Sequence, residues 1–152
     1  VASKAFDQPK RYVFSKDLAL DWNAPFFNLP GQKVVVTSKR SLPKSAKNIK
    51  NLSLLNCKSK GRFLDPKNFI EKISKFQINN ILLESGPNLL GSFGDSNLID
   101  EFIFYISPEK LGSQAEYFYK GKNKINFFDN EQFDIVEETQ VGKDKKIVFR
   151  KK

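Results

Sequence analysis

The sequence of 152 residues predicts an α/β fold whose mixed sheet ends in an antiparallel hairpin. Short runs rich in β-branched and aromatic residues are bounded by turn residues, which is typical of strands. In the middle of the chain an apolar run leads through a glycine turn into a helical pattern, the order of a strand followed by a helix. Because 39% of the residues are hydrophobic, we expect residues 1–152 to bury one core as a single domain.

Three short apolar runs predict the first strands. They are residues 11–15 (RYVFS), 33–37 (KVVVT) and 52–56 (LSLLN). Proline and glycine residues punctuate the segment between the first two runs, so we expect a long irregular connection there.

A helix is predicted to begin at Pro66, after the third strand. Asp65 is the natural N-cap residue, and proline suits the first helical position because it leaves no N–H unsatisfied. The apolar residues that follow recur at helical spacing, which predicts that they face the core. They are Phe69, Ile70, Ile73 and Phe76.

The second half of the chain begins with the apolar run 81–84 (ILLE). A continuous apolar run fits a strand that is buried on both faces of a sheet, so we expect a central, parallel strand here. Gly86 and Pro87 then form a turn, a short helix follows through Phe93, and residues 101–107 (EFIFYIS) predict the next strand.

The last part of the chain is predicted to be an exposed loop followed by a hairpin. Residues 120–124 (KGKNK) are polar and contain glycine, which is typical of a loop. Residues 133–141 and 145–151 are apolar runs separated by Gly142 and its neighbours, and this pattern predicts two antiparallel strands joined by a tight turn.

The composition excludes several kinds of site. The sequence contains no His, which removes histidine triads, histidine-based zinc sites and histidine general bases. Cys57 is the single cysteine, so it can form no internal disulfide, and a lone Cys at the end of a strand is more often structural than reactive. We therefore expect neither a metal site nor a nucleophilic enzyme.

The formal charge of +9 attracts polyanions. The basic clusters lack the interleaved aromatic residues that stack bases, so we expect a solvated basic face, or one cluster that binds a nucleotide phosphate, rather than a nucleic-acid surface. No run approaches the ~20 apolar residues that a membrane helix needs. We expect a cytoplasmic protein with no nucleic-acid or membrane partner.

The most concentrated functional pattern is the segment 84–92 (ESGPNLLGS). Gly86 would let a ligand approach the main chain, and the free N–H groups at the start of the helix after it favour a phosphate. Glu84 ends the predicted strand at the edge where open α/β sheets bind ligands. An ordinary strand-to-helix turn explains the spacing equally well, so the pattern alone leaves both interpretations open.

Two linked motifs carry a resemblance to a known family. They are ILLESGPNLLGSF at 81–93 and LIDEFIFYISPEKLG at 98–112. Their order resembles the reductase domain of the bifunctional riboflavin-biosynthesis deaminase/reductase, which is dihydrofolate-reductase-like. The stretches 8–20 and 30–40 and the C-terminal hairpin are also similar to this superfamily, so the resemblance covers nearly all of the chain.

The resemblance implies a dihydrofolate-reductase-like mixed sheet flanked by helices, with NADPH as cofactor. The implied reaction is reduction of 5-amino-6-(5-phosphoribosylamino)uracil, a small pyrimidine ribose phosphate, to the ribityl product in riboflavin biosynthesis. Glu84 is implied to contact this substrate. The residues implied to bind the cofactor are Gly86, Pro87, Asn88, Leu89, Leu90, Gly91, Ser92, Ser15, Lys16, Ser38 and Lys39.

The sequence also departs from the family. Ser15 and Lys16 stand where an Asp-Ser pair is common, so Lys16 could meet a phosphate as a point charge instead. The family has a first core strand and several substrate contacts in a section without a counterpart here. We therefore expect the first strands of the fold to be missing and this chain alone to be inactive.

Complete members of the family also carry a zinc deaminase domain and tend to form homodimers. Two alternatives to the reductase of riboflavin biosynthesis remain at this point. One is another dihydrofolate-reductase-like NADPH reductase that acts on a pterin or a pyrimidine. The other is a non-catalytic nucleotide-binding or dimerisation module.

Overall fold

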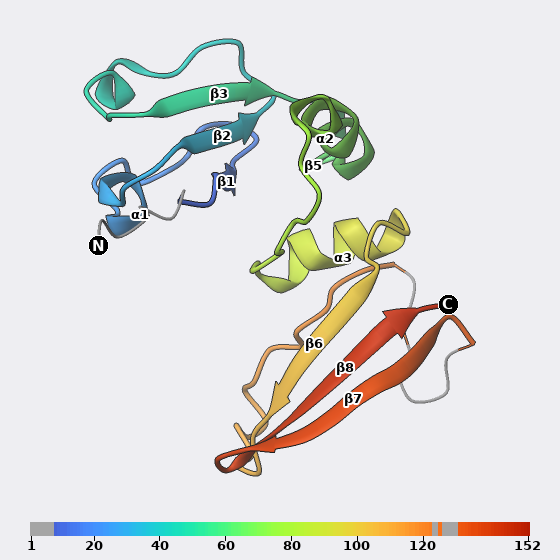
Figure 1. Cartoon of the computed structure of the whole chain (residues 1–152). Coiled ribbons are helices and arrows are strands. Elements are labelled where there is room, and N and C mark those ends of the chain that lie inside the picture. The colour runs from blue at the N-terminus through green and yellow to red at the C-terminus, as the bar shows by residue number, and fades with distance from the viewer. Residues whose placement is uncertain (1–7, 123–124, 126–130) are drawn as a thin grey trace, which may run out of the picture. The chain divides into compact units, whose positions relative to one another are not determined.

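The computed structural model describes residues 8–122, 125 and 131–152. The chain divides into two compact units, Val1–Ile78 and Asn79–Lys152, which are called the first and second unit below (Figure 1). A parallel sheet lies in the first unit and an antiparallel sheet in the second. The α/β class is as predicted, with the parallel and antiparallel strands in separate sheets.

The sheet of the first unit contains the three strands predicted from the sequence. Strands β1 (Arg11–Phe14), β2 (Lys33–Thr37) and β3 (Leu52–Asn56) pair in the order β1-β2-β3, and both pairings are parallel. A short helix α1 (Pro25–Asn28) lies in the connection from β1 to β2, and a 3-10 turn η1 (Lys44–Ala46) lies between β2 and β3. The three predicted strands are therefore confirmed.

The central strand β2 is buried along its whole length. Val35 and Val36 have no exposed surface, as a continuous apolar run predicts for a strand between two neighbours. Lys33 is also buried, and its ammonium donates hydrogen bonds to the carbonyl oxygens of Leu29 at 2.7 Å and Gly31 at 3.3 Å. These bonds offset the cost of removing the charge from water.

Helix α2 (Pro66–Ile73) begins where the sequence predicts it. The Asp65 side chain caps it by accepting a hydrogen bond from the Lys67 amide at 3.0 Å. Phe69 is buried and packs edge-on against two aromatic rings of β1, those of Tyr12 and Phe14. These contacts hold the helix to the sheet.

Beyond α2 the helical pattern ends sooner than predicted. A 3-10 turn η2 (Ser74–Phe76) follows, and Gln77 adopts a left-handed conformation that stops the helix. Phe76 is therefore 58% exposed instead of facing the core. Ahead of α2, the two-residue strands β4 (Ser59–Lys60) and β5 (Phe63–Leu64) form a small hairpin.

The prediction of a central, parallel strand at 81–84 is wrong for this structure. These residues form neither helix nor strand, and Leu82 is 77% exposed. A strand exists only through its ladder of hydrogen bonds to neighbours, and no described strand pairs with this segment. Without a partner, an apolar run cannot become a buried strand.

The second unit combines one helix with an antiparallel sheet. Helix α3 (Pro87–Asp95) precedes the strands β6 (Glu101–Ile106), β7 (Phe133–Val141) and β8 (Asp144–Lys151), which pair in the order β6-β8-β7. The predicted strand at 101–107 and the predicted hairpin are confirmed. Buried side chains from all three strands form the core of the unit, namely Phe102, Phe133, Ile147 and Phe149.

The cap of α2 leads to a stability prediction. Replacing Asp65 with Ala leaves the Lys67 amide without its acceptor, so the free energy of unfolding should fall by about 1 kcal/mol. Asp65→Ser should retain most of the stability, because a serine hydroxyl can also cap a helix. Urea denaturation followed by circular dichroism measures both; equal stability of the alanine variant and wild type would show that the cap contributes nothing.

Candidate functional site

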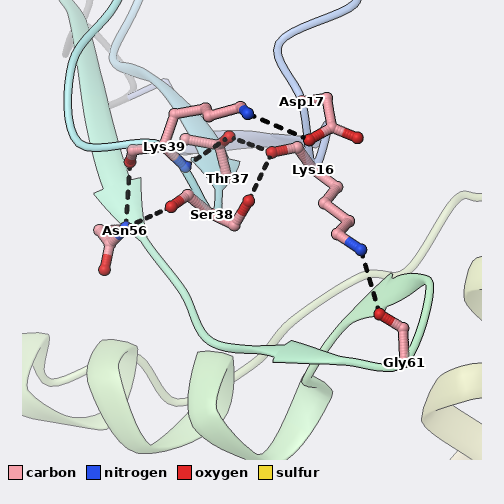
Figure 2. Close-up of polar contacts among 7 residues, drawn as sticks. All are labelled: Lys16, Asp17, Thr37, Ser38, Lys39, Asn56 and Gly61. Atoms are coloured by element: carbon pink, nitrogen blue, oxygen red, sulfur yellow. Dashed lines mark hydrogen bonds and ion pairs between the residues drawn. The ribbon is translucent and has the colours of Figure 1, made fainter.

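Polar side chains gather at the carboxyl ends of the parallel strands in the first unit (Figure 2). The carbonyl oxygen of Lys16, just beyond β1, accepts hydrogen bonds from two hydroxyl groups, Thr37 Oγ1 at 2.8 Å and Ser38 Oγ at 2.9 Å. It also accepts from the Ser38 amide at 3.2 Å. The segments that follow β1 and β2 are therefore tied together at the edge of the sheet where α/β folds bind ligands.

The third strand holds the same segment from its other side. Asn56, the last residue of β3, donates through Nδ2 to the carbonyl oxygens of Ser38 at 3.1 Å and Lys39 at 3.0 Å. The residues after β2 thus lie between the ends of both neighbouring strands, and their main chain has a defined position.

Two lysine ammonium groups lie at this edge. Lys16 Nζ donates to the carbonyl oxygen of Gly61, in the turn between β4 and β5, at 3.0 Å. Lys39 Nζ pairs with Asp17 Oδ1 at 3.4 Å, with the two side chains 52% and 64% exposed. Exposed ion pairs contribute about 0–1 kcal/mol, so this pair leaves Lys39 available to an anionic ligand.

The predicted cofactor residues of the first unit are therefore brought together. Lys16, Ser38 and Lys39 lie in one hydrogen-bonded cluster. Ser15 lies beside them and continues the strand pairing, because its amide donates to the Val36 carbonyl at 2.9 Å. Of their polar groups, the two ammonium groups are of the kind that binds a phosphate, whereas the Ser38 hydroxyl donates its one hydrogen to the Lys16 carbonyl.

In the second unit the predicted turn and helix start are confirmed at Gly86 and Pro87. The N-cap residue Gly86 has no side chain, so it supplies no capping acceptor to the first N–H groups of α3. A Cβ atom on Gly86 would meet nothing within 4 Å, and its φ of −69° suits any residue. Packing within the described part of the second unit therefore does not require glycine here.

Gly91 is different, because the protein itself requires it. A Cβ atom at Gly91 would lie 2.5 Å from the Gly121 amide nitrogen and 2.7 Å from the Lys120 carbonyl oxygen. The Lys120 amide donates to the Pro87 carbonyl at 3.0 Å, so this segment is bonded to the first turn of α3. The predicted loop at 120–124 is irregular through Lys122, as expected, and residues 123–124 lie outside the described part.

Asp95, at the end of α3, holds the same segment. Its carboxylate accepts from the Lys122 amide at 2.8 Å and from the Tyr119 hydroxyl at 3.4 Å. Burial, together with the nearby Asp95 carboxylate, raises the pKa of Tyr119 to about 12. The Tyr119 hydroxyl therefore stays protonated at neutral pH and acts as a hydrogen-bond donor.

The other predicted residues of α3 have contacts within the unit. Leu90 packs against the core of the sheet, and Ser92 Oγ donates to the Asn88 carbonyl at 3.0 Å. Glu84 is exposed ahead of the helix. Contacts of these residues with a cofactor or a substrate stay predictions.

Two further groups bear on chemistry. Cys57 is buried, and burial together with the Asp65 carboxylate raises the pKa of its thiol, which disfavours the reactive thiolate. Within residues 8–122, 125 and 131–152, no group of three or more acidic, His or Cys side chains could hold a metal ion. The described helices include none long and apolar enough to cross a membrane.

The sequence analysis missed several residues of the cluster in the first unit. They are Asp17, Thr37, Asn56 and Gly61. Three of them could have been found from the rule that the carboxyl ends of parallel strands meet at one edge, because Asp17, Thr37 and Asn56 end or follow predicted strands. Gly61 contributes only its carbonyl oxygen, for which the sequence has no pattern.

Solved structures identify the class of fold. A structure of RibD from Acinetobacter baumannii matches 95% of this chain and 38% of that chain, with a TM-score of 0.75 and 21% identity. The riboflavin biosynthesis reductase Rib7 of Saccharomyces cerevisiae matches 96% of this chain and 71% of its own, with a TM-score of 0.70 and 14% identity. The fold is therefore the dihydrofolate-reductase-like fold of these reductase domains.

The family is shown by the sequence itself. The family model described as the RibD C-terminal domain matches residues 2–145, and the chain belongs to this family.

Curated relatives agree with the family. The riboflavin biosynthesis protein RibD of Buchnera aphidicola subsp. Baizongia pistaciae is 42% identical over 98 residues, which are 64% of this chain and 26% of that protein. The 5-amino-6-(5-phosphoribosylamino)uracil reductase of Buchnera aphidicola subsp. Acyrthosiphon pisum is 31% identical over 80 residues, 53% of this chain and 39% of that protein. The chain thus matches well under two thirds of the length of these relatives.

The contrast between Gly86, which precedes α3, and Gly91 within it can be tested by measuring stability. Gly91→Ala should lower the free energy of unfolding by about 1–3 kcal/mol, because its methyl group meets main-chain atoms that cannot move aside freely. Gly86→Ala is the matched control and should change stability by less than about 0.5 kcal/mol. Urea denaturation measures both. A Gly91→Ala protein as stable as wild type would contradict the close packing of Lys120 and Gly121 on α3.

Proposed function

We propose that the chain is the reductase part of an enzyme that reduces 5-amino-6-(5-phosphoribosylamino)uracil with NADPH in riboflavin biosynthesis. The observation that carries the proposal is the match of residues 2–145 to the RibD C-terminal domain family. The similarity to a relative named as this reductase supports the same substrate.

Taken by itself, each unit offers groups that could bind one part of a dinucleotide with a phosphate on its adenosine ribose. In the first unit, the ammonium groups of Lys16 and Lys39 would hold that phosphate, and Ser38 would join them by turning its hydroxyl from the Lys16 carbonyl, to which it now donates its one hydrogen. In the second unit, the open space at Gly86 and the uncapped start of α3 suit the pyrophosphate.

When bound, the cofactor would supply a hydride to C1′ of the ribosylamino group, while the C1′–O4′ bond of the ribose ring breaks and O4′ takes a proton from solvent, which leaves a ribityl chain and the oxidised cofactor. The protein's own contribution is to bind and orient the two molecules. Glu84 is the residue proposed to contact the substrate, and its exposed carboxylate could accept hydrogen bonds from the N–H groups of a pyrimidine.

We also propose that both units belong to one reductase domain, which the coverage of 95% of the chain by a single known fold supports. We further propose that the protein is cytoplasmic, forms a homodimer and has no nucleic-acid or membrane partner. The alternative function, a non-catalytic nucleotide-binding module, predicts a different result, namely cofactor binding without turnover.

The proposal is tested by calorimetric titration of the full-length protein with NADPH and with NADH. We expect tighter binding of NADPH, and a turnover assay with the ribosylaminouracil substrate should then show oxidation of NADPH.

Lys39→Ala should weaken the affinity for NADPH about tenfold and leave the affinity for NADH unchanged, because only NADPH has the additional phosphate.

Lys47→Ala is the matched control for this lysine. Lys47 follows η1 in the connection to the amino end of β3, away from the carboxyl ends of the strands, and its loss should change neither affinity. Equal losses for both cofactors in Lys39→Ala would refute the placement of the phosphate. Binding without turnover in wild type would favour the non-catalytic module.

Gly86→Val tests the pyrophosphate part separately. The branched side chain would occupy the open space at the turn, so affinity should fall at least about tenfold for NADPH and NADH alike, because both carry the pyrophosphate. The backbone angles at Gly86 allow valine, so stability should be retained. Unchanged affinity in the folded variant would exclude this turn from the cofactor site.

A further inference from the structure

Asn56 uses both hydrogens of its side-chain amide on one short segment. Nδ2 donates to the carbonyl oxygens of Ser38 at 3.1 Å and Lys39 at 3.0 Å (Figure 2). An amide nitrogen has two hydrogens, so its donor capacity is fully used here. The opposite orientation of the amide would place its oxygen against two carbonyl oxygens, so these partners also fix which way Asn56 points.

The same segment is held from β1. The Ser38 hydroxyl and amide both donate to the Lys16 carbonyl, at 2.9 Å and 3.2 Å. Bonds to the Lys16 carbonyl on one side and to the Asn56 amide on the other thus hold Ser38 and Lys39 at the sheet edge. The Lys39 amide adds a bond of 3.3 Å to Thr37 Oγ1 within the segment.

We propose that Asn56 is a positioning residue that sets the preference for NADPH over NADH, an inference that rests on the proposed function. Asn56 acts through the segment of Ser38 and Lys39, whose Lys39 ammonium meets the phosphate that only NADPH carries. A segment that is held in place loses little freedom when it binds a phosphate, whereas a released segment must be ordered first. Asn56 therefore strengthens the contact between Lys39 and the phosphate, although Asn56 itself does not touch the phosphate.

A purely structural role for Asn56 predicts a different result. If the residue only closed the end of the sheet, its loss would weaken both cofactors or lower stability without changing the preference. NADH shares the rest of the molecule with NADPH, so the ratio of the two dissociation constants isolates the phosphate contact.

The test is calorimetric titration of the full-length Asn56→Ala protein with NADPH and NADH. The Kd for NADPH should rise about tenfold, while the Kd for NADH stays within about twofold of wild type. Asn56→Asp keeps the shape but replaces the donor with a carboxylate that repels phosphate, so its loss of NADPH affinity should be larger. Asn48→Ala, at an exposed asparagine of the η1–β3 connection, is the control and should change neither constant.

A double-mutant cycle shows whether Asn56 acts through Lys39. In a protein that already carries Lys39→Ala, adding Asn56→Ala should change NADPH affinity by less than it does in wild type. Fully additive effects, equal losses for both cofactors, or an unchanged ratio in the two Asn56 variants would each overturn the inference while leaving the proposed function in place. A wild-type protein that does not prefer NADPH would overturn both.

Discussion

Parallel pairing of β1, β2 and β3 is the constraint on which the candidate site in the first unit depends. Strands that run in the same direction end at the same edge, so polar residues distant in sequence meet there. Lys16, Ser38 and Asn56 come from three different strand ends and form one hydrogen-bonded cluster. The complete burial of β2 holds this edge in place, because its two neighbours cannot separate without exposing valine side chains to water.

The second unit places its candidate site by a different device, the close approach of main chain to a helix. Gly91 admits the segment at Lys120 and Gly121 against α3, and Asp95 ties that segment at the other end of the helix. At Gly86, by contrast, no described residue comes within 4 Å of the place where a Cβ atom would lie. The same residue type thus serves packing at Gly91, while Gly86 borders open space within the described part of its unit.

Charge has a local role that the total of +9 does not reveal. Basic residues on β8 pair with acidic residues on its neighbours, as Arg150 does with Glu101 and Lys146 with Glu137. Lys39 has the Asp17 carboxylate beside it, but both side chains are largely exposed, so water screens their attraction. The Lys39 ammonium is therefore only weakly held by its partner.

The sequence by itself determined β1, β2 and β3, the strands β6, β7 and β8, the start of α2 at Asp65 and Pro66, and the turn at Gly86, because these depend on local periodicity and capping; it gave no sign of the two-residue strands β4 and β5. Tertiary structure alone decided what each residue contacts. The apolar run 81–84 has no strand partner, so its composition could not make it a strand. The contacts of Asn56 could not be predicted from the sequence either. They exist only because the neighbouring strand brings two carbonyl oxygens within reach of the side-chain amide.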